Sequence, residues 1–133
     1  MSDDDFPDPE AVLERGRRYR AKLDEYGEAK EKETITELFT LLGRAYALPV
    51  LHTFSWSDEP LRFSDLEDHL DVSPTTLSKR LSELTEAGLL TRRSYDEIPP
   101  RVEYEPTAAA DDLAPVFIHL YEWASVHDLD GEE

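Results

Sequence analysis

The chain has no cysteine, a single methionine and only four lysines among its 133 residues. Without cysteine it can form no disulfide, thiolate metal site or thiol redox switch. No apolar run approaches the ~20 residues that a membrane-spanning helix needs. The N-terminal stretch MSDDDFPDPE also has no apolar segment of the kind found in signal peptides. We therefore expect a soluble, cytoplasmic protein that does not associate with membranes.

Positive charge is also scarce. Fourteen Lys and Arg residues stand against 31 Asp and Glu residues, which gives a formal net charge of −17. Disorder would explain such acidity, but the apolar periodicity described below argues against it for most of the chain. Acidic surfaces remain solvated in concentrated salt, which also screens their self-repulsion. The composition therefore predicts a halophilic source.

The length predicts one domain with extensions. We expect disordered acidic tails at residues 1–10 and 128–133, a helical extension over 11–32, and the main domain over 33–127. The extension is the one locally basic segment, and two interpretations stay open: an arm that contacts DNA or a partner subunit, or a solvated helix. Apolar residues then recur at i, i+3, i+4 and i+7, which predicts a core helix ending at Gly43: Ile35, Leu38, Phe39 and Leu42.

The segment from Phe63 to Tyr104 has the clearest local signals. Ser64 and Glu67 form the pattern of a capping box at the start of one helix. Ser73 and Pro74 predict the start of a second helix, over residues 74–87, and Gly88 predicts its end. A strand, a turn and a return strand follow over residues 89–104.

A last helix is predicted from Thr107 to about His127, with Pro115 expected to kink or split it. Together these elements predict a mainly α fold with a small β-hairpin. The order of helices and strands is that of a winged helix-turn-helix, with additional N- and C-terminal helices.

A helix that enters the DNA major groove reads bases with side chains of its N-terminal half. Hydroxyl groups and cations gather on that half of helix 74–87, and arginines follow on the hairpin. Arg92 and Arg93 point to opposite faces of their strand, so only one of the two is expected to face DNA. The predicted DNA-contacting residues are Ser73, Thr75, Thr76, Ser78, Lys79, Arg80, Arg92, Arg93 and Arg101.

The segments GRAYALPVL, RFSDLEDHL, SPTTLSKRLSELTEAGLLTR and IPPRVEY, with a last helix containing Trp123, resemble HxlR-type winged helix-turn-helix regulators. The resemblance covers roughly residues 34–127 and, with the composition, points to a halophilic archaeon. It implies a homodimeric, nucleoid-associated transcription regulator that pairs through its terminal helices. It also implies a dimer interface on the last helix: Leu113, Phe117, Leu120, Tyr121 and Trp123. Many members carry a cysteine near the first core helix, and this chain has none.

Two readings compete with sequence-specific DNA binding by a homodimer on a palindromic operator. The acidic surface suits a winged-helix module that binds protein instead. An enzyme is the other alternative, but the sequence contains no nucleophile motif or phosphate loop, and no pattern that predicts a metal or cofactor. A small-molecule effector is left open, because no motif identifies one.

Overall fold

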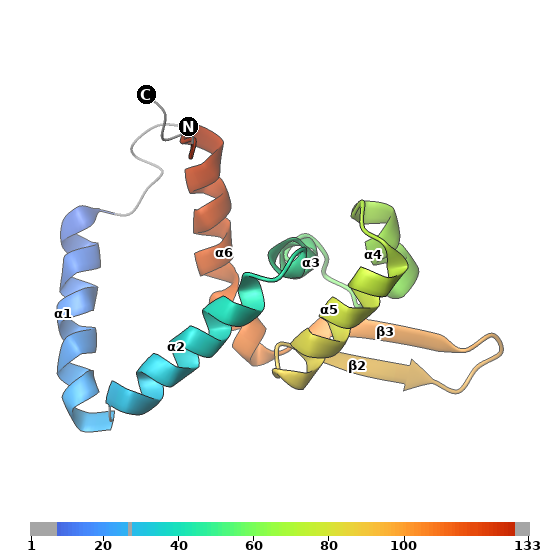
Figure 1. Ribbon diagram of the computed structural model, residues 1–133, viewed down its shortest axis with the longest axis horizontal. Coiled ribbons are helices and arrows are strands. Elements are labelled where there is room, and N and C mark those ends of the chain that lie inside the picture. The colour runs from blue at the N-terminus through green and yellow to red at the C-terminus, as the bar shows by residue number, and fades with distance from the viewer. Residues whose placement is uncertain (1–7, 27, 130–133) are drawn as a thin grey trace.

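The computed structural model describes residues 8–26 and 28–129. Six helices and a small sheet follow in the chain order α1, α2, α3, β1, α4, α5, β2, β3, α6 (Figure 1). The N-terminal helices are α1 (Pro9–Tyr26), α2 (Glu28–Leu42) and α3 (Ala47–Phe54). This is the mainly α fold with a β-hairpin that the sequence predicted. None of the helices in the described residues is long and apolar enough to cross a membrane.

The sheet is antiparallel and has the strand order β1-β3-β2. It consists of β1 (Leu61–Arg62), β2 (Leu90–Tyr95) and β3 (Arg101–Pro106). Strands β2 and β3 form a hairpin that projects past the helices, as Figure 1 shows. This hairpin is the wing, and the register pairs Leu90 with Pro106 at its base and Tyr95 with Arg101 near its tip.

The core lies between α3, α4 (Phe63–His69), α5 (Pro74–Glu86) and the sheet. Leucines at helical spacing on α5 turn inward and are fully buried, and Leu66 of α4 meets them. Gly88, at φ +84°, ends the helix in the left-handed conformation, so that Leu89 and Leu90 enter the same core. The predicted helix start at Pro74 and stop at Gly88 are both confirmed.

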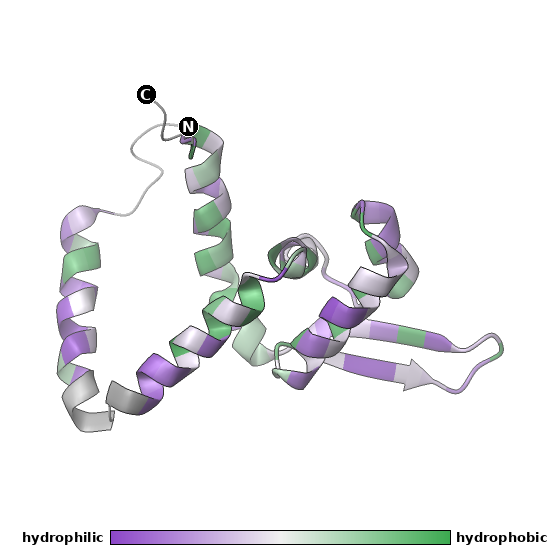
Figure 2. Cartoon of the chain, in the orientation of Figure 1, coloured by the Kyte–Doolittle hydropathy of each residue, from purple (hydrophilic) through white to green (hydrophobic). Residues whose placement is uncertain are grey.

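Helix α6 (Ala108–Val126) begins as predicted, with Thr107 as its cap. The Thr107 hydroxyl accepts a hydrogen bond from the backbone N–H of Ala110 at 3.3 Å and donates one to the Gly88 carbonyl at 2.6 Å. The helix continues across Pro115, which therefore does not split it. Phe117 anchors α6 in the core, while hydrophobic residues extend along the rest of the helix (Figure 2).

Four local predictions need correction. The cap of helix α4 is Arg62 instead of Ser64, so the capping box lies two residues earlier than predicted. Its carboxylate is that of Asp65, which accepts from the Arg62 backbone N–H at 2.9 Å, and not that of Glu67. Helix α1 already begins at Pro9, and residues 1–7 of the predicted tail lie outside the described residues.

The predicted extension and the core helix are also divided differently, because α2 already begins at Glu28. Within α2, Leu38 and Leu42 pack against the core, but Ile35 and Phe39 are exposed. The prediction that all four form a core stripe is therefore wrong, because α2 contacts the core with only part of its apolar face. A periodic apolar face indicates burial without saying which surface provides it.

Candidate nucleic-acid interface

Helices α4 and α5 form the helix-turn-helix, and a serine cap fixes how α5 begins. The Ser73 hydroxyl accepts from the Thr76 backbone N–H at 3.2 Å and donates to the Thr76 hydroxyl at 3.1 Å. The opposite side of α5 is anchored in the core by three fully buried leucines, Leu77, Leu81 and Leu84. Because one face is anchored this way, the other face is held in a fixed orientation toward solvent.

That outer face displays short hydroxyl side chains and one cation. Thr75, Ser78 and Lys79 are exposed, and Thr76 is half-buried beside its capping partner. Within the described part of the chain Lys79 has no ion-pair partner. Hydroxyl groups can donate to or accept from base edges, and an ammonium group can reach guanine or a phosphate oxygen.

Arg80 lies on the flank of α5 and makes internal bonds. Its Nε donates to the carbonyl of Ala45 at 2.7 Å, and a terminal nitrogen donates to Glu83 at 2.9 Å. The other oxygen of Glu83 pairs with Arg44 at 2.9 Å. The Arg80 side chain is 15% exposed. These groups clamp α5 to the loop between α2 and α3, so Arg80 has a structural role that the helical wheel did not indicate.

Glu83 sits between those two arginines. Partial burial alone would raise its pKa, but the hydrogen bonds and charges of Arg44 and Arg80 outweigh desolvation and hold the pKa of Glu83 below its ordinary value. The carboxylate is therefore ionised whenever the clamp is formed near neutral pH. Its charge also reduces the positive field of both arginines toward solvent.

The wing separates Arg92 from Arg93. In the register of the hairpin, Arg92 lies opposite Tyr104. Because side chains alternate along a strand, Arg92 is on the same face of the sheet as the buried Leu90. Helix α5 packs on this face. Arg93 is on the opposite face and forms an ion pair with Glu105 at 3.6 Å. The neighbouring Tyr95 hydroxyl and Glu105 raise the pKa of Arg93.

Arg101 is held within the wing. Its guanidinium lies 4.0 Å from the centre of the Tyr95 ring and pairs with Glu97 at 3.2 Å. Glu103 is 3.6 Å from Nε, too far for a hydrogen bond, and this buried nitrogen has no hydrogen-bond partner among the described residues. Of the predicted DNA-contacting cations, Lys79 and Arg92 are the two without an ion-pair partner in residues 8–26 and 28–129.

The five residues expected at a dimer interface fall into two groups. Phe117 is 3% exposed inside its own core, and Leu113 packs against that core. Leu120, Tyr121 and Trp123 are exposed farther along α6. Other apolar side chains of α1, α2 and α6 are exposed with them: Val12, Leu13, Tyr19, Ile35, Phe39, Val116, Ile118 and Val126.

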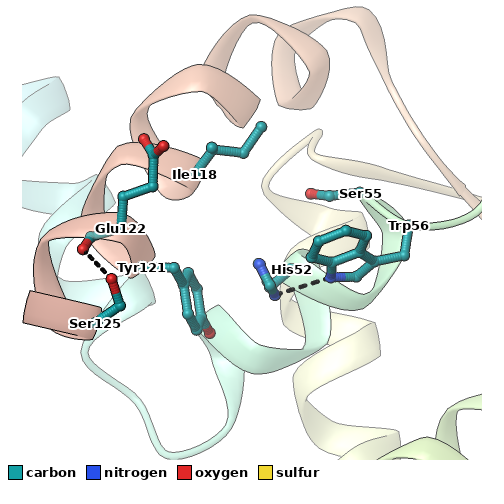
Figure 3. A pocket seen from close by; sticks show the side chains of 7 residues that line it. All are labelled: His52, Ser55, Trp56, Ile118, Tyr121, Glu122 and Ser125. Carbon is teal, nitrogen blue, oxygen red and sulfur yellow. Dashed lines mark hydrogen bonds between the residues drawn. The ribbon is translucent and has the colours of Figure 1, made fainter. Parts of the chain in front are cut away.

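Sequence reasoning missed one aromatic cluster, although it named one of its members, Tyr121, for the dimer interface. The rings of His52, Trp56 and Tyr121 meet between the end of α3 and α6, as Figure 3 shows. Trp56 follows α3 in a polar stretch and is 76% exposed. A lone tryptophan among polar residues was the available signal, since such a ring has no core of its own to enter.

Comparison with known proteins agrees with this geometry. The family model for HxlR-like helix-turn-helix proteins matches residues 41–130. A Halalkalibacterium halodurans protein, named an uncharacterized HTH-type transcriptional regulator, is 34% identical over 85 residues, which is 63% of this chain and 74% of that relative. A Methanothermobacter thermautotrophicus protein of the same description is 35% identical over 71 residues, and the alignment spans 54% of it.

Solved structures give the same result for the fold. The reduced form of the transcriptional regulator YodB from Bacillus subtilis superposes with a TM-score of 0.62 at 27% identity, covering 74% of this chain and 96% of YodB. A possible HxlR family transcriptional factor from Thermoplasma volcanium superposes with a TM-score of 0.61 at 24% identity, covering 67% and 79% of the two chains. The second likeness concerns the fold alone.

Proposed function

The chain belongs to the family of HxlR-like helix-turn-helix transcriptional regulators, and we propose that it acts as a homodimer that reads a palindromic site in double-stranded DNA. The family is one of regulators and not of enzymes. The observation that carries the proposal is the presence of Lys79 on α5, among exposed hydroxyl groups, and of Arg92 on the wing. Both are cations without an ion-pair partner in the part of the chain that the structure describes.

In the proposed complex α5 lies in the major groove. Thr75, Ser78 and Lys79 face base edges and adjacent phosphates, while the Ser73–Thr76 cap presents the helix N-terminus to the backbone. Arg92 contacts a phosphate or the minor groove beside it. We leave Arg80, Arg93 and Arg101 out of the contact set, because each already pairs with a carboxylate of its own chain.

The proposed dimer forms through α6 together with α1 and α2. Their exposed apolar residues gain a partner surface in this way, which a single chain does not offer. A two-fold axis then sets two α5 helices to read half-sites about 34–36 Å apart, one turn of DNA.

A matched pair of variants tests the assignment of the wing. Arg92→Ala and Arg93→Ala remove the same charge from opposite faces of one strand. We expect Arg92→Ala to weaken binding to DNA from the protein's own upstream region roughly tenfold, and Arg93→Ala to change it less than about twofold. Fluorescence anisotropy in molar potassium chloride measures both. Equal losses would mean that the wing contributes only net charge.

Lys79→Ala tests the recognition helix. A base contact contributes about 1–3 kcal/mol of discrimination, so this variant should lose preference for the specific site over scrambled DNA. If no DNA shift occurs with the wild type at any salt concentration while a protein partner co-purifies, the alternative winged-helix interaction module would replace this proposal.

Salt dependence should also reflect how few cations the proposed DNA face offers. Lys79 and Arg92 of each subunit give four in a dimer, so counterion release at this face predicts a log–log slope no steeper than about −4. Nearby acidic side chains reduce it further, and the affinity falls less with salt than for a basic homologue. A measured slope of roughly −8 or steeper would show that many more phosphates are neutralised than this surface allows.

A further inference from the structure

A cavity of about 440 Å³ lies between the end of α3 and the outer half of α6. Its walls include His52 and Trp56 on one side and Ile118, Tyr121 and Glu122 on the other (Figure 3). This volume is within the range of ligand sites for small molecules. The cavity lies apart from the DNA-facing side of α5 and the wing.

Three rings of this cavity hold one another in place. The His52 ring stacks on Tyr121, with centres 3.7 Å apart, and meets the edge of Trp56 at 5.5 Å. The Trp56 indole N–H points to His52 Nδ1 at 3.4 Å, which leaves the proton of a neutral imidazole on Nε2. Burial lowers the pKa of His52, so the neutral form predominates near pH 7.

The charges of the lining determine which ligand suits it. Among the residues that line the cavity, Glu122 is the one carboxylate, and no lysine or arginine is present. An anion would meet this carboxylate without a compensating base, in a protein of formal charge −17. A cation is attracted both by Glu122 and by the faces of tryptophan and tyrosine rings.

We propose that this cavity binds a small organic cation, an amine or quaternary ammonium ion with an apolar body. The positive group lies among Trp56, Tyr121 and Glu122, and the apolar body contacts Ile118. The site goes beyond DNA binding and gives a chemical class to the effector that the sequence left open. Because its walls come from both α3 and α6, an occupant contacts the DNA-binding core and the proposed dimer helix at once.

A second cavity provides the contrast. It has a volume of about 530 Å³ between α2, the end of α5 and the start of α6, and Glu37 lines it together with leucines. Its lining contains no aromatic ring, so it offers a carboxylate without cation–π partners. Glu37 is therefore a matched control for Glu122, since both carboxylates border an apolar cavity.

Isothermal titration calorimetry on the full chain tests the proposal with three probes of similar size: benzyltrimethylammonium, benzyl alcohol and benzoate. At one fixed sodium chloride concentration we expect the cation to bind about tenfold more tightly than the neutral alcohol, and benzoate to bind most weakly. Glu122→Gln should bring the cation close to the alcohol, whereas Glu37→Gln should leave the preference unchanged. Trp56→Ala should weaken binding of both.

Three results would overturn the proposal: no binding of the cation to the wild-type protein, equal binding of cation and alcohol, or an equal effect of Glu37→Gln and Glu122→Gln. Analytical ultracentrifugation covers the other occupant, a second copy of this chain. If Trp56→Ala turned a dimer into monomers, the cavity would be an interface and not a ligand site. None of these measurements involves DNA, so this proposal and the proposed function can fail separately.

Discussion

The winged-helix core and the terminal helices differ in the burial of their apolar side chains. Leu66, Leu77, Leu81 and Leu84 of α4 and α5 are fully buried within one chain. Apolar side chains of α1, α2 and the outer half of α6 remain exposed, although they recur at similar helical intervals. Figure 1 shows α1 joined to the start of α2 and standing apart from the winged-helix core, and the side chains of residues 8–22 are exposed. The first region buries its apolar side chains within one chain, whereas the second leaves them exposed.

The largest effect should come from breaking the winged-helix core. Leu81→Ala removes a fully buried side chain at the centre of the α5 packing. We expect it to lower the free energy of unfolding by about 3 kcal/mol, through lost transfer energy and the cavity left behind. Urea unfolding followed by circular dichroism measures this loss. A loss under about 1 kcal/mol would mean that the core rearranges freely and is not close-packed.

The terminal region should respond in assembly instead of in folding. Leu120→Glu places a charge on the exposed part of α6, where a single chain buries little. We expect a folded monomer with unchanged circular dichroism and an affinity for its DNA site at least tenfold weaker, because only one half-site is then held. Sedimentation velocity measures the mass.

Asp112→Asn, an exposed substitution nearer the start of α6, is a useful control for the monomer result. It changes the same helix without adding a charge to the apolar surface. A Leu120→Glu protein that stayed dimeric with full affinity would remove α6 from the proposed interface. Truncation after Ala110 is a harsher version of the test, because it also deletes Phe117 from the core.

Within the wing, Arg101 is bonded to its own chain, whereas Arg92 has no ion-pair partner among the described residues. Arg101→Ala removes the cation from the Tyr95 ring and the ion pair with Glu97. We expect it to cost about 1 kcal/mol of stability, whereas Arg92→Ala should leave stability unchanged and weaken DNA binding. Thermal unfolding and anisotropy on the same two proteins separate the effects. Loss of DNA binding without loss of stability in Arg101→Ala would return Arg101 to the contact set.

Local chemistry made part of this structure predictable. A capping hydroxyl and a glycine act within a few residues, so Ser73, Gly88 and Thr107 marked helix boundaries correctly. The exposure of Ile35 and Phe39 was not predictable, because an amphipathic pattern does not say whether the surface that covers the apolar face belongs to the same chain.

The contacts of long side chains were also not predictable from the sequence. The helical wheel placed Arg80 on an outer flank, but its partner is the carbonyl of Ala45, 35 residues away in sequence. Strand alternation likewise gave the face of Arg101 without revealing that Tyr95 and Glu97 already hold it. The halophilic source predicted from composition stays a prediction, since folded geometry does not report the surrounding salt.

The smallest expected effect is the pH dependence of the clamp around Glu83. The pKa of Glu83 in the folded chain lies below its ordinary value of 4.5, so the clamp contributes stability above that value and loses it as pH falls through the folded pKa. Glu83→Gln should therefore lower stability by up to about 1 kcal/mol at pH 7 and by progressively less toward pH 3.

Subtracting the free energy of unfolding of the variant from that of the wild type, both measured by urea unfolding, cancels the titration of the other acidic residues. Glu86→Gln, an exposed substitution on the same helix, controls for the change in net charge. A gap between wild type and Glu83→Gln that stayed constant from pH 7 to pH 3 would show that the clamp depends on hydrogen-bond geometry and not on the charge of Glu83.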